Sequence, residues 1–183
     1  MCLTFISLYT FVRVQYSVPP VVETGEVQGT KTITPISQPV RLVVVTIGVD
    51  TIIRPAGLTS DSDMAISDNP DEVAWYQLGT KPGQQGSAVI AGHYGWKDGH
   101  GSVFNRLHTL MAGDQVSTYD DKGVVTTFIV RETRKYDPTA DATEVFKSTD
   151  GGVHLNLITC DGTWVQSKDS YSNRLVVFTD LEK

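Results

Sequence analysis

Three residues of this chain combine types and positions that suit covalent catalysis. His93 and Cys160 each follow an apolar run, and Arg174 opens another one, 14 positions after the cysteine. A cysteine is a strong nucleophile only as the thiolate, so it needs a nearby base or cation. A histidine can share that proton and pass it to a leaving amine, and an arginine can hold a developing oxyanion. Together the three side chains suit acyl transfer through a thioester.

Two of the three residues, Cys160 and Arg174, also have ordinary structural explanations. A single cysteine at a strand end often packs as a small hydrophobe, and Arg174 can equally pair with a carboxylate on a sheet surface. The sequence identifies no Asp or Asn as a third member of a catalytic set. The order of the three residues and their strand context therefore favour catalysis more than any one of them does.

The part of the chain that carries this chemistry, residues 40–183, is rich in short β-prone runs. Strands are predicted at 41–53 (two, with bend points at Gly48 and Asp50), 87–92, 115–119, 124–131, 153–159 and 174–179. Short helical stretches are predicted at 71–77, 103–110 and 142–148. Many short strands with few helices predict a mainly β fold, closed or nearly closed into a barrel.

The first 39 residues differ from the rest of the chain. Residues 17–39 contain four of the eight prolines, which favours an extended linker. Residues 1–16 contain an apolar stretch that is shorter than the roughly 20 residues a helix needs to cross a bilayer. This stretch is interpreted as a clipped signal anchor or membrane-proximal segment, with a short packed or amphipathic segment and a weak secretion signal as alternatives.

Composition narrows the classes of function. The chain has 183 residues, of which 40% are hydrophobic and 20% charged, as expected of one globular domain. The net charge of -6 and the lack of a basic run disfavour a nucleic-acid partner. The two cysteines lack the spacing of a zinc site, so we expect no metal and no cofactor. Calcium at Asp114, Asp120 and Asp121 is an alternative to ordinary solvated carboxylates.

The segment around the cysteine resembles the Thr-Leu-x-Thr-Cys signature of the sortases, cysteine transpeptidases that attach secreted proteins to bacterial cell walls. Leu157, Thr159 and Cys160 match it, and Asn156 stands at its first Thr. In a strand, Asn156 faces away from the side that carries Leu157 and Thr159. The segments that end in His93 and begin before Arg174 are similar to those that carry the sortase histidine and arginine. Further similar stretches lie at 73–76, 82–90 and 104–107, so the resemblance spans about 40–182.

The resemblance implies a closed eight-stranded sortase-like β-barrel and a two-step reaction. Cys160 would attack the Thr–Gly bond of a sorting signal similar to Leu-Pro-x-Thr-Gly, and His93 would protonate the leaving amine. A peptidoglycan or pilin-type amine would then take the acyl group, while Arg174 stabilises both tetrahedral intermediates. Thr159 would line the substrate site. His100 and Trp164 lie in the loops after His93 and Cys160, and we expect them to contact substrate.

The resemblance also implies partners and a location. The substrates would be secreted proteins with C-terminal sorting signals, and the chain would act at the extracytoplasmic face of a bacterial cell membrane, tethered by its N-terminus. Pilin-polymerising sortases carry an Asp-Pro-aromatic lid before the barrel, and no Asp precedes residue 40. We therefore expect a compact type near classes E and F.

Two other classes of protein stay open. A non-catalytic β-barrel that binds a peptide or a wall polymer would tolerate loss of Cys160. Another peptidoglycan-directed cysteine hydrolase or transpeptidase also pairs Cys with His, but an L,D-transpeptidase places its histidine close before its cysteine. Here 67 positions separate His93 from Cys160. A His-paired cysteine is also expected to alkylate well below the pH typical of a free thiol, whose pKa is about 8.5.

Overall fold

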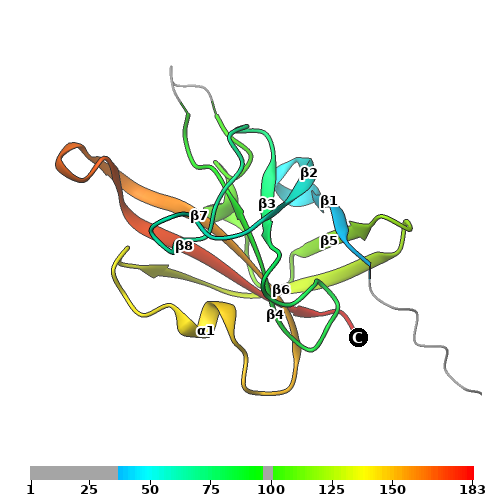
Figure 1. Cartoon of the computed structure of the whole chain (residues 1–183). Coiled ribbons are helices and arrows are strands. Elements are labelled where there is room, and N and C mark those ends of the chain that lie inside the picture. The colour runs from blue at the N-terminus through cyan, green and yellow to red at the C-terminus, as the bar shows by residue number, and fades with distance from the viewer. Residues whose placement is uncertain (1–36, 97–100) are drawn as a thin grey trace, which may run out of the picture. The chain divides into compact units, whose positions relative to one another are not determined.

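The structure is a computed structural model that describes residues 37–96 and 101–183. In these residues eight strands close into a barrel, in the order β1-β2-β3-β4-β7-β8-β6-β5 (Figure 1). The strands are β1 (Pro39–Val44), β2 (Val49–Ala56), β3 (Val73–Tyr76), β4 (Gly86–Gly92), β5 (Gln115–Asp120), β6 (Val125–Tyr136), β7 (Val153–Val165) and β8 (Ser170–Leu181). The connections contain the helix α1 (Thr143–Phe146) and the 3-10 helices η1 (Val45–Ile47), η3 (Leu107–Thr109) and η4 (Gln166–Lys168). The mainly β, closed eight-stranded barrel expected from the sequence is thus confirmed.

Neighbouring strands are antiparallel except in two pairs. β2 pairs with β3, and β4 pairs with β7, in parallel. A parallel neighbour requires a long crossover, and the chain between β4 and β7 supplies it with β5, β6 and α1. As a result, the carboxyl ends of β4 and β7 meet at the same edge of the barrel.

Alternation along β7 separates the barrel interior from its outer face. Leu155 and Leu157 are fully buried in a cluster that contains residues from every strand, so they point into the barrel. Ile158 points the other way and packs in a second cluster with Val145 of α1 and Val176 of β8. α1 therefore covers part of the outer face beside β7 and β8 (Figure 1).

One predicted helix is wrong. Residues 73–76, inside the helix expected at 71–77, form β3 between β2 and β4. Val73, Ala74 and Trp75 are all buried, so this run shows neither a helical nor an alternating pattern, and burial between two strands decides its conformation. The helices expected at 103–110 and 142–148 shorten to η3 and α1.

Two strands are longer than expected, which changes the setting of the reactive residues. β7 continues past Cys160 to Val165, and β8 begins at Ser170, before Arg174. Cys160 and Arg174 therefore lie inside a paired hairpin and not at strand ends. The pairing is irregular between Asp161 and Trp164, where Gly162 has a positive φ of 86°.

The hairpin predicted from 115–131 is present as β5 and β6. The Asp120 carboxylate accepts hydrogen bonds from the backbone N–H groups of Lys122 and Val124, at 2.9 and 2.8 Å. Gly123 completes the turn with a φ of 78°, which favours glycine. Asp120 thus serves its own turn.

The predicted anchor, residues 1–16, lies outside the described residues, as does nearly all of the predicted linker at 17–39. Within 37–96 and 101–183, no helix is both long and apolar enough to cross a membrane.

Candidate active site

Three neighbouring strands bring His93, Cys160 and Arg174 together. Ala91 of β4 is the register partner of Ile158 of β7, so two residues further on His93 lies beside Cys160. Cys160 is directly opposite Arg174 across the antiparallel β7–β8 pair. Because partners in register share a face of the sheet, the three side chains lie on the outer face of the barrel.

All three residues line one cavity of about 500 Å³, called here the apolar cavity. Its floor is the outer face of β7 and β8, and its walls come from the β2–β3 and β6–β7 connections. The apolar side chains around it are Met64, Ile66, Val145, Phe146, Ile158 and Val176. An apolar cavity that ends at a cysteine, a histidine and an arginine can bind an apolar peptide segment and present one of its carbonyls to the thiol.

The Cys160 thiol is half-buried, and burial raises its pKa above the ordinary value. The positive charge of Arg174 lowers this pKa, but by less than burial raises it. The resting cysteine is therefore mainly a neutral thiol at neutral pH. The expectation of alkylation well below the pH typical of a free thiol is accordingly revised, since proton transfer must accompany or precede attack by the sulfur.

The His93 ring is fixed by a backbone carbonyl. Its Nε2 lies 2.7 Å from the carbonyl oxygen of Ser67, and because a carbonyl only accepts hydrogen bonds, Nε2 carries a proton. In the neutral ring, Nδ1 is then the nitrogen that can accept a proton. The rings of His93 and Trp96 form an edge-to-face contact, with centroids 4.8 Å apart and an interplanar angle of 69°. The sequence identified no Asp or Asn that could orient the histidine. In the structure, the carbonyl of Ser67 holds this position.

A polar network holds Ser67 in place. The Ser67 hydroxyl donates to the Glu72 carboxylate at 3.3 Å, and it accepts the backbone N–H of Asn69 at 3.2 Å. Glu72 forms a two-pronged ion pair with Arg54 of β2, at 2.9 and 2.8 Å. Hydrogen bonding and charge from Arg54 lower the pKa of Glu72, so this carboxylate is ionised. The orientation of His93 therefore depends on the β2–β3 connection, which carries Ser67 and Glu72, and on Arg54 of β2.

Arg174 is held by neutral groups. Its Nη1 donates to the carbonyl oxygens of Tyr171 and Asn173, at 3.3 and 3.1 Å, and its Nη2 donates to the hydroxyl of Ser170 at 3.0 Å. In the described part of the chain, no Asp or Glu forms an ion pair with Arg174. The alternative that it pairs with a surface carboxylate finds no support there. Its charge beside Cys160 is thus available to an anionic group.

Thr159 lines the apolar cavity, but its hydroxyl points elsewhere. The side chain is 2% exposed, and Oγ1 donates to the carbonyl oxygen of Gly92 at 2.8 Å. This bond joins β7 and β4 one residue before Cys160 and one before His93. The geometry gives the Thr159 hydroxyl a positioning role, while contact with substrate stays a prediction.

The two other predicted contact residues have different outcomes. Trp164 is 49% exposed on β7 and lines a second cavity, together with His93 and Cys160. His100 lies outside the described residues, so its expected contact with substrate stays a prediction.

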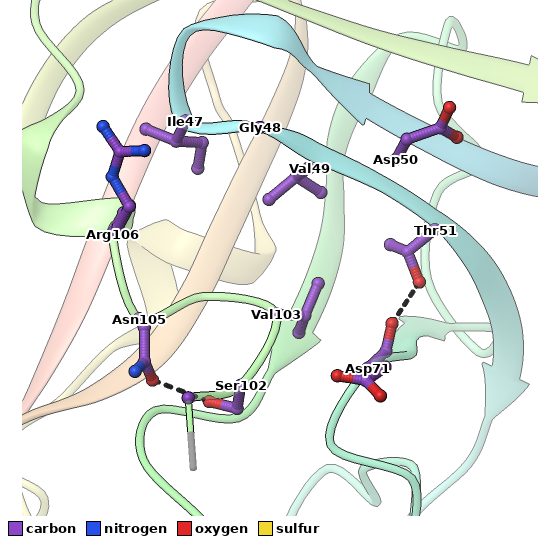
Figure 2. A pocket seen from close by; sticks show the side chains of 11 residues that line it. Ile47, Gly48, Val49, Asp50, Thr51, Asp71, Ser102, Val103, Asn105 and Arg106 are labelled. Atoms are coloured by element: carbon purple, nitrogen blue, oxygen red, sulfur yellow. Dashed lines mark hydrogen bonds between the residues drawn. The ribbon is translucent and has the colours of Figure 1, made fainter.

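A third pocket, of about 330 Å³, lies away from the three residues, between the start of β2 and the segment after β4 (Figure 2). Asn105 in this pocket accepts a hydrogen bond from the Ser102 hydroxyl at 2.9 Å (Figure 2). It also accepts one from the Gly95 N–H at 2.7 Å. Ser102 also donates to the carbonyl oxygen of His93 at 2.7 Å. Ser102 and Asn105 therefore hold the backbone at His93 and Gly95 in place by hydrogen bonds.

Two of the three carboxylates considered for calcium, Asp114 and Asp120, have local partners. Asp114 accepts hydrogen bonds from Thr46 Oγ1 and from the Met111 N–H, and Asp120 holds its own turn. Among residues 37–96 and 101–183, no three acidic, histidine or cysteine side chains gather as a metal ion would need.

The comparisons with known proteins agree with this architecture. The family model of the sortase domain matches residues 42–182, and the chain therefore belongs to the sortase family. Sortase C-1 from Actinomyces oris is similar in structure, with a TM-score of 0.60, 22% identity, and 80% of this chain and 76% of that chain covered. For sortase A from Corynebacterium diphtheriae (lid mutant) the TM-score is 0.62, with 18% identity and 79% and 70% covered. Sortase C1 from Streptococcus agalactiae in complex with MTSET also gives 0.62, with 18% identity and 79% and 68% covered. No curated protein matches the sequence.

Within the sortase signature, Asn156 replaces the first Thr. Its side chain is 1% exposed on the outer face, and Nδ2 donates to the carbonyl oxygen of Val145 at 2.6 Å. The prediction that Asn156 faces away from Leu157 and Thr159 is confirmed. Its amide therefore attaches α1 to β7. The subclass near classes E and F stays a prediction.

Sequence reasoning missed the groups that orient the three residues. The Ser67 carbonyl and Glu72 lie in the β2–β3 connection, and a backbone carbonyl leaves no mark in a sequence. Tyr171 and Asp169 in the second cavity were missed as well. One signal was available for Asp169 and Tyr171: both lie in the short stretch of sequence between Trp164 and Arg174, two residues already singled out.

Proposed function

We propose that this chain is a sortase-type cysteine transpeptidase that cleaves an LPxTG-like sorting signal between Thr and Gly and joins the acyl group to a cell-wall amine. The observation that carries the proposal is the meeting of His93, Cys160 and Arg174 at the end of one apolar cavity. Membership of the sortase family supports it.

In the first step, the Cys160 proton passes to Nδ1 of His93 and the sulfur attacks the Thr carbonyl carbon. Arg174 stabilises the oxyanion, since its guanidinium is held beside the sulfur by neutral groups. The imidazolium then gives its proton to the departing Gly nitrogen, and a thioester on Cys160 remains. Because burial raises the pKa of the thiol, Cys160 must lose its proton before or during the attack.

In the second step, an amine attacks the thioester and the thiolate leaves. The acceptor is a peptidoglycan or pilin-type amine, and water is the slower alternative. Both steps use only side chains and backbone groups of this chain, so the proposed reaction requires no metal and no cofactor.

The proposal has consequences for partners and location. The acyl donors are secreted proteins with a C-terminal sorting signal, and the net charge of -6 disfavours nucleic acid as a partner. Sorting signals are met at the extracytoplasmic face of a bacterial cell membrane, so we place the enzyme there, with residues 1–16 as its tether.

The test is mass spectrometry on the purified full chain with Leu-Pro-x-Thr-Gly and Leu-Ala-x-Thr-Gly peptides, each with and without triglycine. Ligated product that is lost in Cys160→Ala supports the transpeptidase and shows which signal is preferred. Arg174→Lys keeps the charge but loses the planar fork, and we expect it to lose most of the rate. Cleavage without ligation would favour a cysteine hydrolase. Absence of both thioester and product would favour a non-catalytic binding module.

A further inference from the structure

Asp161, the residue directly after Cys160, is buried although it carries a carboxyl group. It is 6% exposed, and no step of the proposed reaction uses it. Its Oδ2 atom is shielded from solvent and makes no well-aligned hydrogen bond within the part of the chain that the structure describes. A buried carboxylate lowers stability unless a cation compensates its charge. The position of Asp161 therefore requires a cationic partner.

Lys135 of β6 is that partner. Its Nζ lies 2.7 Å from Oδ2 of Asp161, and because the contact is poorly aligned as a hydrogen bond, it acts mainly through charge. Among residues 37–96 and 101–183, no other Lys, Arg or His forms an ion pair with this carboxylate. The Lys135 side chain is largely exposed, whereas that of Asp161 is not. Without Lys135, the carboxylate would have to move to reach water.

The ion pair crosses β8 at the level of Arg174. Lys135 is the register partner of Leu175 in the β6–β8 pair. Asp161 is the register partner of Asn173 in the β7–β8 pair. Because side chains alternate along a strand, Asn173 and Leu175 point to one face of β8 and Arg174 points to the other. The ion pair therefore connects β6 to β7 on the face of the sheet opposite to the reactive side chains.

Backbone pairing holds β7 less firmly after Asp161. The β7–β8 register is irregular between Asp161 and Trp164, and Gly162 in this interval has a φ of 86°. Such an irregularity disrupts the ladder of backbone hydrogen bonds locally. The side chain of Asp161 is thus an attachment of β7 just before the ladder is interrupted. Because Cys160 and Asp161 share a peptide unit, a displacement of Asp161 would turn the backbone that carries the sulfur.

We propose that Lys135 is a positioning residue: by compensating the charge of Asp161, it keeps that side chain buried and so fixes Cys160 opposite Arg174 for attack on the sorting signal. This inference rests on the proposed transpeptidase function and adds a residue to it. Neither Lys135 nor Asp161 lines the apolar cavity or the second cavity. The pair therefore acts on the step in which the sulfur attacks and not on the binding of the peptide.

The test measures thioester formation on Cys160 of the full chain by quenched-flow mass spectrometry, at several concentrations of the Leu-Pro-x-Thr-Gly peptide. Lys135→Met removes the cation, and Lys135→Arg keeps it. Lys135→Met combined with Asp161→Asn removes both charges, and an amide is easier to bury than an unpaired carboxylate. Arg41→Met is the matched control, because it breaks a 2.6 Å ion pair with Asp50 and neither residue lines the apolar cavity or the second cavity.

In Lys135→Met, we expect the maximal rate of thioester formation to fall about tenfold, as a partial displacement of the sulfur implies. KM for the peptide should change less than about twofold, since the apolar cavity is untouched. Lys135→Arg and the double variant should both reach within about threefold of the native rate, because neither leaves a buried carboxylate without a cation. Arg41→Met should keep the native rate.

A native rate in Lys135→Met would overturn the inference while leaving the transpeptidase intact. A double variant no faster than Lys135→Met, or a loss confined to KM, would overturn it as well. If Lys135→Met does not fold, Lys135→Gln takes its place, because it is also neutral and keeps a hydrogen-bond donor for Asp161. Failure of the native chain to form any thioester would instead remove the proposed function itself.

Discussion

The hydrogen bond from Thr159 to Gly92 predicts a variant in which stability and catalysis can be separated. The bond, 2.8 Å long and buried, joins the ends of β7 and β4 next to Cys160 and His93. Thr159→Val keeps the shape of the side chain and removes only the donor. We therefore expect a loss of stability from the unpaired carbonyl and a loss of rate from the altered spacing of the sulfur and the imidazole.

The expected losses of unfolding free energy and of rate both follow from the contact that is removed. Leaving a buried carbonyl without its donor costs about 1–2 kcal/mol of unfolding free energy. For a domain of this size, each kcal/mol lowers Tm by roughly 2–4 °C, so Tm should fall by about 2–8 °C. A displacement on the order of 1 Å can cost about 100-fold in rate, and a partial shift of one strand end should cost about 10-fold in thioester formation.

Thr179 provides the matched control. Its hydroxyl donates to the carbonyl oxygen of Leu155 at 2.7 Å, and the residue is fully buried between the same two strands that carry Cys160 and Arg174. Because this bond lies at the far end of β7, Thr179→Val should lose similar stability and keep the native rate of thioester formation. Thr159→Ser keeps the hydroxyl and should recover most of the rate.

The assay pairs urea unfolding with quenched-flow mass spectrometry of the Cys160 thioester, well below both melting temperatures. Equal rates in Thr159→Val and Thr179→Val would refute the positioning argument and leave the Thr159 bond with a purely structural role. A change confined to KM for the sorting peptide would instead return Thr159 to the direct substrate contact expected from the sequence.

Three further variants probe the supports of the site and of the barrel. Glu72→Gln should weaken the hold on Ser67, whose carbonyl orients the His93 ring. We expect it to lower kcat about fivefold with little change in KM and to shift the pH–rate profile. An unshifted profile would contradict this. Burial lowers the pKa of His154, but Asp150 and Asp180 raise it more, so the folded pKa exceeds the unfolded value of about 6.5. This contribution to stability is complete below pH of about 6.5 and is lost as pH rises through the folded pKa. In urea unfolding, the native chain should therefore be more stable at low pH by an increment that His154→Gln lacks. Parallel curves of stability against pH for the two proteins would contradict this prediction. In Gly92→Ala, the added Cβ would lie 2.6 Å from Cδ2 of the fully buried Phe104. Overpacking there should cost about 1–3 kcal/mol, and an unchanged thermal melt would show that the core yields.

The barrel, and the meeting of His93, Cys160 and Arg174 on it, were predictable because their signals are local. Alternating β-branched runs mark strands, and the order of His93, Cys160 and Arg174 along the chain identifies the strands that carry them. β3 was not predictable as a strand because Val73, Ala74 and Trp75 are buried together, which erases the period of two. The parallel pairing of β4 with β7 was equally hidden, since register is set by contacts distant in sequence.

The supports of the site were hidden for a different reason. The Ser67 carbonyl acts through its backbone, and its position depends on the Glu72–Arg54 pair, whose members come from different elements. The resting state of Cys160 was hidden too, because its burial follows from cavity walls that the connections build. Burial raises the pKa of the thiol more than Arg174 lowers it, and only a folded chain reveals which effect is larger.

In this barrel, the candidate catalytic groups are attached to strands, whereas most of the cavity walls are attached to the connections between strands. His93, Cys160 and Arg174 lie on or directly after β4, β7 and β8, three adjacent strands whose spacing is fixed by backbone hydrogen bonds. The walls of the apolar cavity come from the β2–β3 and β6–β7 connections, and the second cavity is lined by the segment after His93 and by the β7–β8 hairpin. A change in a connection can therefore alter which donor or acceptor binds without moving the sulfur relative to the imidazole. The exception is Ser67, because its connection both lines the apolar cavity and orients His93, and substitutions near it should change specificity and rate together.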